Sequence, residues 1–231
     1  MSNLRFAFRQ TIPIFFTYLF IGTAFGIMMT EAGYGPFWSV LSSLFTFAGS
    51  LQIVMVSLLR AGVPLLTVAV MTLFINGRHI FYGIGLIERF RRMGWRMPYM
   101  VFALTDETYS ILCSLRYEEG VDPIRADFLI ALLNQCYWVF GTLIGSVAGK
   151  LLPFDMRGID FSATAFFLVV VVDQWRRSGS KLPSIVGICS ALIFYLLLGP
   201  DRFLIPALAV GTVLLVILRD RIERKKGADG A

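Results

Sequence analysis

The sequence predicts an all-α integral membrane protein, a polytopic helical bundle with about six full spans plus two broken or re-entrant segments. Composition is the first reason: 57% of the 231 residues are hydrophobic and 16% are charged, against roughly 45–50% and about 25% in soluble domains. The second reason is that charges gather in clusters between long apolar runs, as loops and spans alternate, instead of recurring along helix faces. We therefore expect residues 1–231 to form a single transmembrane domain, ending in a short basic cytoplasmic tail over 219–231.

Six apolar segments are candidates to cross the hydrocarbon core, which requires roughly 20 residues of helix. They are Ile12–Thr30, Pro36–Leu59, Phe128–Leu152, Phe161–Val172 with its flanks, Pro183–Gly199 and Phe203–Leu218. The first follows Arg5 and Arg9, and no small-residue cleavage site ends it, so we interpret it as a retained span. Two further segments, Ala61–Ile87 and Met97–Leu115, are apolar but interrupted by polar residues.

The basic residues indicate which loops face the cytoplasm, because Lys and Arg are enriched on that side. The rule places the N-terminus, Arg60, the four arginines within 89–96 and the basic tail inside. These assignments agree if Ala61–Ile87 and Met97–Leu115 each enter and leave on one face, which gives six crossings and two cytoplasmic termini. The alternative is eight spans, with the four-arginine loop outside. Either arrangement suits a multi-pass protein of a bacterial inner membrane.

The net charge of +6 does not indicate nucleic-acid binding, because the basic residues lie at span ends, where they meet anionic lipid. The three cysteines lie in apolar stretches, and no pair has the spacing of metal ligands; they are Cys113, Cys136 and Cys189. No ATP-binding loop of the Gly-x-x-x-x-Gly-Lys-Ser/Thr type is present. We expect neither a metal nor a cofactor.

Regularly spaced glycines predict where helices pack closely, because helix association in lipid depends on close backbone approach. One run consists of Gly141, Gly145 and Gly149, and a second of Gly22 and Gly26. A longer pattern recurs, since Tyr18-x-x-x-Gly22-Thr23-x-x-Gly26 reappears as Tyr137-x-x-x-Gly141-Thr142-x-x-Gly145. Internal repeats are common in transporters, so the match indicates either a repeat or a coincidence within a Gly-rich sequence.

The first polar cluster within apolar sequence is Asn76-Gly77-Arg78-His79. A charge at the centre of the membrane costs about 2.5–3.5 kcal/mol, so it persists where it is paired, hydrated or functional. Gly77 permits a helix break, and the free N–H and C=O groups of a broken helix can bind ligand. Arg78 adds a fixed positive charge, and His79 is the only histidine. The alternative is that Arg78 and His79 end a span at the headgroups.

The second polar cluster is Asp106-Glu107, whose side chains point about 100° apart on a helix. We expect Asp106 to pair with Arg78 or His79, while Glu107 faces water or substrate. A carboxylate in such a place can accept an ammonium group or carry a coupling proton. The alternative is a loop of solvated acids at the membrane surface.

Two weaker polar sites remain. Gly49 and Ser50 can loosen the helix of the second expected span, in which the Gln52 amide needs a partner. Asn134 lies in the span expected at Phe128–Leu152. Each amide is either a hydrogen bond between helices or a contact to substrate.

Three segments resemble, in order and spacing, the signatures of the AzlC-like (YgaZ-type) branched-chain amino acid permeases. They are Ala48-Gly-Ser-Leu-Gln52, Asn76-Gly-Arg-His-Ile-Phe-Tyr-Gly83 and Leu104-Thr-Asp-Glu-Thr-Tyr109. The resemblance covers nearly the whole chain. It implies export of branched-chain or related neutral amino acids by a secondary transporter driven by an ion gradient, for which protons are a candidate. It also implies a small membrane partner of the AzlD or YgaH type and no enzymatic activity.

Two other functions remain open from the residues alone. A channel, or an accessory membrane subunit, would also contain broken helices and paired charges. An intramembrane hydrolase would need a nucleophile beside a base, for which Ser50 or Ser110 with His79 are available.

Overall fold

The computed structural model describes residues 2–151, 168, 171–172, 175–176, 181–199 and 203–218. The chain divides into two compact units, Met1–Val68 with Ile75–Ser162 and Ala69–Phe74 with Ala163–Ala231, and each is described by itself. Every regular element among the described residues is a helix, and no strand is found among them. The all-α class expected from the composition is therefore observed.

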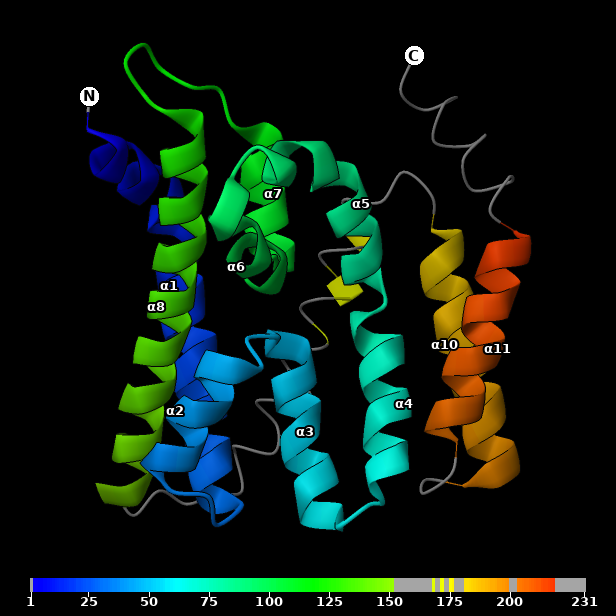
Figure 1. Ribbon diagram of the computed structural model, residues 1–231. Coiled ribbons are helices and arrows are strands. Elements are labelled where there is room, and N and C mark those ends of the chain that lie inside the picture. The colour runs from blue at the N-terminus through cyan, green and yellow to red at the C-terminus, as the bar shows by residue number, and fades with distance from the viewer. Residues whose placement is uncertain are drawn as a thin grey trace. The chain divides into compact units, whose positions relative to one another are not determined.

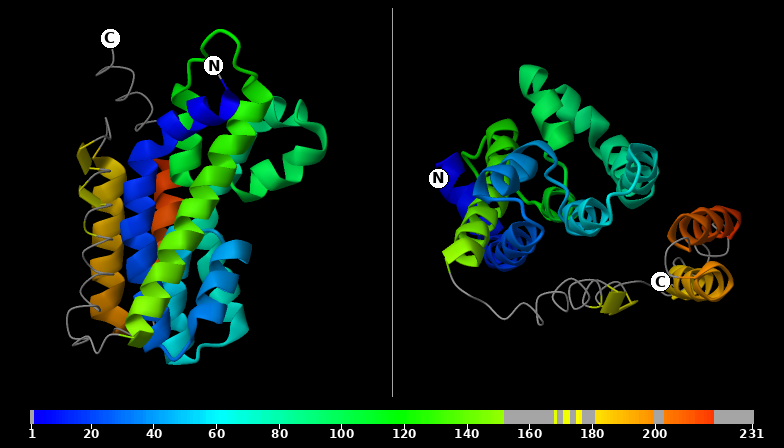
Figure 2. Two further views of the ribbon diagram at one scale, coloured as in Figure 1. Left: turned by 90° about the vertical axis from the view of Figure 1, so that its left-hand side faces the viewer. Right: turned by 90° about the horizontal axis from the view of Figure 1, so that it is seen from below.

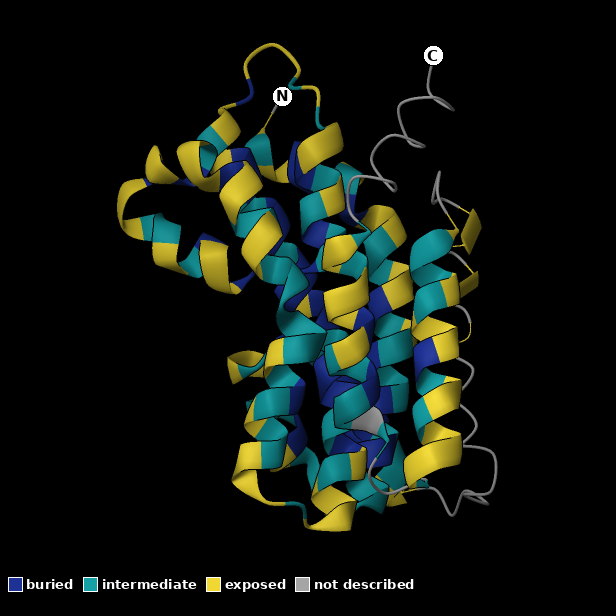
Figure 3. Ribbon diagram, turned by 90° about the vertical axis from the view of Figure 1, so that its right-hand side faces the viewer, coloured by how far each residue is buried: buried dark blue, intermediate teal, exposed yellow. Residues whose placement is uncertain are grey.

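Two long helices of the larger unit, α1 (Asn3–Glu31) and α8 (Pro123–Leu151), lie side by side (Figures 1 and 2). Each has 29 residues and is apolar enough to cross a membrane. They contain the span expected at Ile12–Thr30 and all but the last residue, which is not described, of the one expected at Phe128–Leu152. Their outward faces carry exposed aromatic side chains, and in Figure 3 exposed residues likewise cover the outer faces of helices while buried ones lie between them. Such faces suit lipid.

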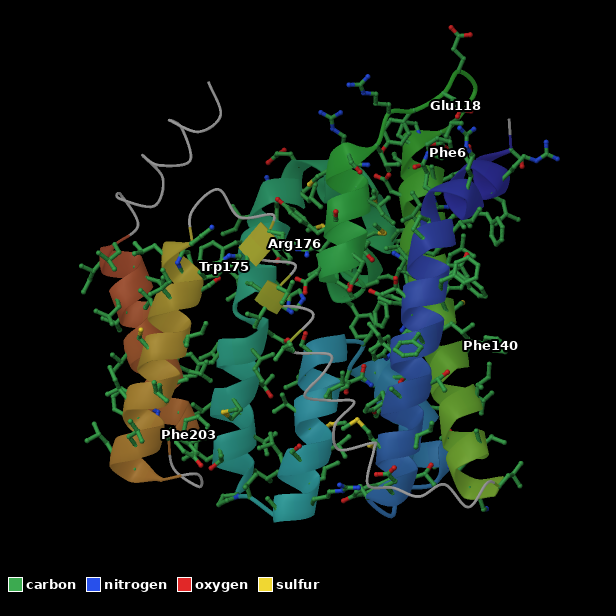
Figure 4. The ribbon with its side chains drawn as sticks, turned by 180° about the vertical axis from the view of Figure 1, so that it is seen from behind. Phe6, Glu118, Phe140, Trp175, Arg176 and Phe203 are labelled. Carbon is green, nitrogen blue, oxygen red and sulfur yellow. The ribbon has the colours of Figure 1, made fainter. Side chains whose placement is uncertain are left out.

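Contacts at both ends show that α1 and α8 run parallel. At the N-terminal ends, Arg9 Nη1 lies 3.3 Å from Oε1 of Glu118, a residue of the loop before α8 that Figure 4 labels. At the C-terminal ends, Thr30 Oγ1 donates to the Ser146 carbonyl at 3.1 Å. A Cβ added at Gly149 would lie 3.4 Å from the Cβ of Thr30. The two helices are therefore in contact along most of their length.

The repeated glycine pattern lies at the seam between α1 and α8. A Cβ added at Gly22 would lie 3.3 Å from the Cα of Gly141. At Gly26 and Gly145, an added Cβ would overlap backbone atoms of the opposite helix. Thr23 Oγ1 donates across the seam to the Gly141 carbonyl at 3.3 Å. The two copies of the pattern thus pack against each other, and only glycine permits this approach of the two backbones.

The segment expected as one span at Pro36–Leu59 is two short helices, α2 (Pro36–Phe45) and α3 (Gly49–Ala61). A helix of 10 residues extends about 15 Å, half of the hydrocarbon thickness. The prediction of a single span here is wrong. It failed because a run of apolar residues predicts burial in lipid but does not show where the backbone turns.

The chain reverses direction between α2 and α3. Gln52 Nε2 donates to the hydroxyls of Ser42 and Ser43 at 3.0 and 3.2 Å, contacts that a straight helix would not allow. Phe47, with φ at 34°, lies in the turn, and its side chain is buried. Residues 36–61 therefore form a helical hairpin whose tip lies at Thr46–Ala48.

The interrupted segment Ala61–Ile87 forms a bent pair of helices, α4 (Leu65–Asn76) and α5 (Arg78–Arg91), with an angle of 51° at the break. Figure 1 shows α5 continuing onward from α4. The break expected at Asn76–His79 is therefore observed, and whether the segment enters and leaves on one face stays a prediction. Together the two helices are long and apolar enough to count as one broken span.

Arg60, at the end of α3, is paired with a residue of α1. Its guanidinium lies 3.1 Å from the carboxylate of Glu31 at the end of α1, and the Glu31 side chain is only 5% exposed. This ion pair ties the loop between α3 and α4 to the end of α1.

The segment Met97–Leu115 turns back on itself, as a re-entrant segment would. It follows a 3-10 turn, η1 (Gly94–Arg96), and contains α6 (Met97–Phe102) and α7 (Asp106–Ser114). At its beginning, the Tyr99 ring lies 5.3 Å from Phe128 near the start of α8. Its other end leads into the loop before α8. This second hairpin therefore lies at the N-terminal end of α8.

The tips of the two hairpins meet. The ring of Phe47, at the tip of α2–α3, lies 6.4 Å from the ring of Phe102, at the tip of α6–α7. Because α2–α3 starts and ends near the C-terminal end of α1, the hairpins approach from opposite ends of the α1–α8 pair. The meeting point is about midway along the long helices.

A buried ion pair fixes the outer ends of α5, α7 and α8. Arg89 donates from Nε and Nη2 to both carboxylate oxygens of Asp127, at 2.7 and 2.6 Å, and from Nη1 to the Leu112 carbonyl at 2.6 Å. Asp127 is 1% exposed. Tyr117, in the loop before α8, donates to Asp127 at 2.7 Å. Burial is the main cause that raises the pKa of the Tyr117 hydroxyl, and the hydrogen bond to Asp127 raises it further, so the hydroxyl stays protonated.

The smaller unit contains two apolar helices, α10 (Leu182–Leu198) and α11 (Leu204–Ile217). They pack together, and Ser190 Oγ donates to the Ala207 carbonyl at 2.7 Å. They lie where spans were expected at Pro183–Gly199 and Phe203–Leu218, but with 17 and 14 residues they are shorter than α1 and α8, so their crossing of the membrane stays a prediction. Most of the span expected at Phe161–Val172, and the tail 219–231, lie outside the described residues.

Candidate functional site

Three helices of the larger unit begin near the hairpin tips. They are α3 at Gly49, α5 at Arg78 and α7 at Asp106. A helix N-terminus carries a partial positive charge and unpaired N–H groups. The Thr105 hydroxyl caps α7 by accepting from the Thr108 N–H at 3.3 Å. The tip region is therefore a place where backbone groups favour negative charge.

Arg78 connects these three helices. Its Nη2 lies 2.6 Å from Asp106 Oδ2 and donates to Ser50 Oγ at 3.2 Å. The side chains of Arg78 and Asp106 are 32% and 39% exposed. The pairing expected between the two polar clusters is present in the structure. It lets both charges lie within an apolar unit without standing alone.

The ion pair retains hydrogen-bonding capacity. Arg78 Nε and Asp106 Oδ1 are buried atoms without a hydrogen-bond partner among the described residues. One is a donor with positive charge and the other an acceptor with negative charge. The pair therefore has one unused donor and one unused acceptor, both buried beside the ion pair.

Glu107 faces a different neighbour, as its direction on α7 requires. The Tyr18 hydroxyl of α1 donates to Glu107 Oε2 at 2.7 Å and lies 2.8 Å from Thr105 Oγ1. The hydroxyl oxygens of Thr105 and Thr108 are 3.2 Å apart. Asn134 Nδ2, on α8, donates to Thr108 Oγ1 at 3.0 Å. A hydrogen-bonded chain thus runs from the carboxylate of α7 past α1 to α8.

His79 and Asn76 lie at the bend between α4 and α5. His79 Nδ1 is 3.1 Å from the Asn76 carbonyl, and its ring lies edge-on to Tyr82 at 5.6 Å. Tyr82 stacks on Tyr109 of α7 at 4.4 Å. The bend occurs at Gly77, but that residue keeps a right-handed helical conformation, with φ −54° and ψ −29°. The expected reason for glycine there, an unusual backbone geometry, is therefore wrong.

Gly49 and Ser50 also differ from expectation. They are the first two residues of α3 and do not interrupt a helix, because the break precedes them at 46–48. A Cβ added at Gly49 would lie 3.1 Å from the ring of Trp138 on α8. Gly49 therefore lets the start of α3 pack against the Trp138 ring of α8. Ser50 supplies the hydroxyl that accepts a hydrogen bond from Arg78.

Gln52 belongs to the hairpin and not to the ion-pair cluster. It is 0% exposed, and its Oε1 accepts from Trp138 Nε1 at 2.9 Å while its amide nitrogen holds Ser42 and Ser43. Ser43 in turn lies 2.9 Å from the Thr142 hydroxyl of α8. The amide is thus occupied in joining α2, α3 and α8.

Tyr18 and the Arg89–Asp127 pair were not among the residues predicted for the site. Tyr18 had one signal, its position in the repeated pattern. Arg89 and Asp127 had none, since charges at span ends are ordinary in a membrane protein. Among the described residues, no three His, Cys, Asp or Glu side chains gather to hold a metal ion.

The chain is similar to several known proteins. The family model described as AzlC protein matches residues 13–152. An uncharacterized membrane protein of Helicobacter pylori (strain J99) is 36% identical over 96% of this chain and 98% of its own length. The branched-chain amino acid transport protein AzlC of Bacillus subtilis is 34% identical over 96% and 88%. The inner membrane protein YgaZ of Escherichia coli is 28% identical over 74% and 73%. No solved structure matches the chain.

Proposed function

The chain belongs to the AzlC family, and we propose that it is a secondary transporter that exports branched-chain or related neutral amino acids, coupled to a proton gradient. The Bacillus subtilis relative is named as a branched-chain amino acid transport protein, and this supports the substrate class because the two chains align over nearly their whole lengths. Relatives named as membrane or transport proteins support a transporter over an enzyme. We place the chain in the bacterial inner membrane with both termini in the cytoplasm, acting with a small AzlD- or YgaH-like membrane subunit.

The observation that carries the proposal is the Arg78–Asp106 pair where three helices begin. An amino acid zwitterion needs donors for its carboxylate and an acceptor for its ammonium group. Arg78 Nε and the start of α3 supply donors, and Asp106 Oδ1 supplies the acceptor. Phe47 and Phe102, whose rings meet at the hairpin tips, offer apolar contact for an aliphatic side chain.

Glu107 is our candidate for the coupling proton. It lies beside Asp106 on α7 but bonds to Tyr18 and not to Arg78, so it can change its protonation state without breaking the ion pair. Two hairpins that meet from opposite ends also suit alternating access, because each can open one side while the other stays closed. His79 and Asn76 at the bend, with Asn134 and Gln52, complete the proposed pathway.

Transport by reconstituted vesicles tests the proposal. The purified chain, alone and with its small partner subunit, should accumulate labelled Leu, Val, Ile or Met when a proton gradient is imposed, and should saturate with substrate. Asp106→Asn and Glu107→Gln should each lower the initial rate by at least about tenfold, and Glu107→Gln should also remove its pH dependence. The control Glu118→Gln removes an exposed carboxylate that pairs with Arg9, and it should transport normally.

Other outcomes would replace the proposal. Current without saturation or coupling would indicate a channel, and normal rates in both carboxylate variants would indicate an accessory role for this chain. A hydrolase has less support, because Ser50 Oγ accepts from Arg78 and no hydrogen bond to His79 is found among the described residues.

A further inference from the structure

The direction of the hydrogen-bonded chain between Glu107 and Asn134 follows from counting hydrogens, because each hydroxyl has one. When Glu107 is ionised, it accepts the Tyr18 hydrogen over 2.7 Å. Thr105 must then supply the hydrogen for its 2.8 Å contact with Tyr18. The Thr105 hydroxyl is also placed to donate to Thr108 over 3.2 Å, so its single hydrogen serves either Tyr18 or Thr108, and Thr108 Oγ1 accepts from Asn134 Nδ2.

A proton on Glu107 reverses this order. The carboxyl O–H then donates to Tyr18, Tyr18 donates to Thr105, and Thr105 donates to Thr108. With Thr105 as the donor, the Thr108 hydrogen needs an acceptor on another residue. Asn134 Oδ1 can accept it if the amide turns over, because Nδ2 already lies 3.0 Å from Thr108 Oγ1. Asn134 is 0% exposed, and its Oδ1 has no hydrogen-bond partner among the described residues, so the acceptor is free for this purpose.

We propose that Tyr18 is a positioning residue through which the protonation state of Glu107 sets the direction of this chain and, with it, the attachment of the α6–α7 hairpin to α1 and α8. The inference rests on the proposed function, in which Glu107 carries the coupling proton. One proton moves from water to the carboxylate, and none travels along the chain. Three hydroxyls and one amide rotate, and no other covalent bond changes. The hairpin is therefore held by different hydrogen bonds in the two protonation states.

The charged groups near Glu107 remain in place when Tyr18 is changed. Asp106 adjoins it on α7 and is paired with Arg78 of α5 at 2.6 Å. His79, next to Arg78, contacts the Asn76 carbonyl. From α1 the titratable neighbour is Tyr18, and α8 contributes the neutral Asn134. A change in pH dependence caused by Tyr18→Phe therefore reports on Glu107 and its hydroxyl chain.

The repeat supplies a matched control for Tyr18. Tyr137 occupies the equivalent position in the second copy of the pattern, and both side chains are buried. The Tyr137 hydroxyl lies 3.1 Å from the Thr11 hydroxyl, so its contact is neutral. Tyr137→Phe removes the same atom from the same kind of environment without touching a carboxylate.

The experiment measures transport against pH in vesicles containing the full chain and its partner subunit. Because the Tyr18 hydrogen bond favours the ionised carboxylate, Tyr18→Phe should move the midpoint of the pH profile upward by about one pH unit. Thr108→Val, which breaks the chain one step further on, should move it in the same direction by less. Tyr137→Phe should keep the wild-type midpoint. Unchanged midpoints in both Tyr18→Phe and Thr108→Val would overturn the proposal.

Infrared difference spectroscopy gives a second measurement that does not depend on transport. The carboxyl C=O band that titrates with pH and is missing in Glu107→Gln belongs to Glu107, and its midpoint should shift upward in Tyr18→Phe. If the wild-type chain transports no amino acid but the band shifts, the proposed function fails while the hydrogen-bond chain stands. If transport is pH-dependent and the band midpoint is the same in wild type and Tyr18→Phe, the chain proposal alone fails.

Discussion

Arg78 makes two contacts from one nitrogen and keeps a separate donor, which a lysine in its place would lack. Its guanidinium reaches Asp106 on α7 and Ser50 on α3 from a single nitrogen while keeping Nε free. A lysine has one compact ammonium group and no planar fork. At the residue scale, the geometry of the charge therefore matters as much as its sign.

We predict that Arg78→Lys lowers the initial transport rate about tenfold, because the single ammonium nitrogen has no second, separate donor that could take the place of Nε toward substrate. Its thermal stability in detergent should stay close to that of the wild type. Arg91→Lys is the control, since Arg91 forms an exposed pair with Glu88 at 3.1 Å. Equal rates in Arg78→Lys and wild type would show that the guanidinium shape is not used.

The sequence predicted the charged residues of the site better than the neutral ones. Arg78 and Asp106 were identifiable because an isolated charge in an apolar run is costly and needs a reason. Tyr18 gave no such signal, because a tyrosine within an apolar helix is ordinarily a packing residue. Its bond to Glu107 depends on which helices are neighbours, and that information is not local in the sequence.

At the scale of elements, α5 and α7 are joined at three levels along their common direction. Arg78 pairs with Asp106 at their starts, Tyr82 stacks on Tyr109 in the middle, and Arg89 donates to the Leu112 carbonyl near the end of α7. Two helices held at three levels should move as one body. A signal at Glu107 on α7 would then reach Arg78 on α5 without a separate connection.

The breaks were harder to locate than the helices. Both polar interruptions marked real discontinuities, at Gly77 and before Asp106. The tip at Thr46–Ala48 was missed because Phe47 and Ala48 are apolar, and the polar residues that stabilise the turn lie outside it. The reversal is held by Gln52, Ser42 and Trp138, which are separated in sequence and meet only in the fold.

We predict that Gly145→Ala destabilises the α1–α8 seam, because the added methyl group would overlap the Thr23 backbone, which cannot move aside as a side chain can. The cost should be about 3 kcal/mol, at the upper end for overpacking in a core. It should appear as a lower midpoint of thermal unfolding in detergent. Gly83→Ala is the control, since an added Cβ there meets no atom within 4 Å. A Gly145→Ala protein as stable as Gly83→Ala would mean that the seam can separate without cost.

At the scale of the larger unit, the two copies of the repeat are parallel, because α1 and α8 run in the same direction with Gly22 beside Gly141. The chain between them must therefore return to the side on which it started. The α4–α5 pair makes that return. Each hairpin starts and ends on a single side, α2–α3 at the C-terminal end of α1 and α6–α7 at the N-terminal end of α8. The path expected from the basic residues differs from this one because it places Arg60 on the same side as the N-terminus.

This path makes a testable prediction about which loops share a side. In a chain whose three cysteines are replaced by serine, single cysteines at Ala32 and Ala61 should react with a membrane-impermeant maleimide from the same side. A cysteine at Glu119, in the loop before α8, should react only from the other side, which we assign to the cytoplasm. Each position lies in or beside a loop, so labelling should leave the fold intact. The six-crossing path expected from the basic residues places position 61 with position 119 instead, and labelling of Ala61→Cys from the cytoplasm would restore it. In that path the α2–α3 segment crosses the membrane as one helix, and Gln52 cannot contact Ser42 and Ser43. Cysteines placed at 42 and 52 test this directly, because they form a disulfide in the hairpin and cannot form one in a straight helix.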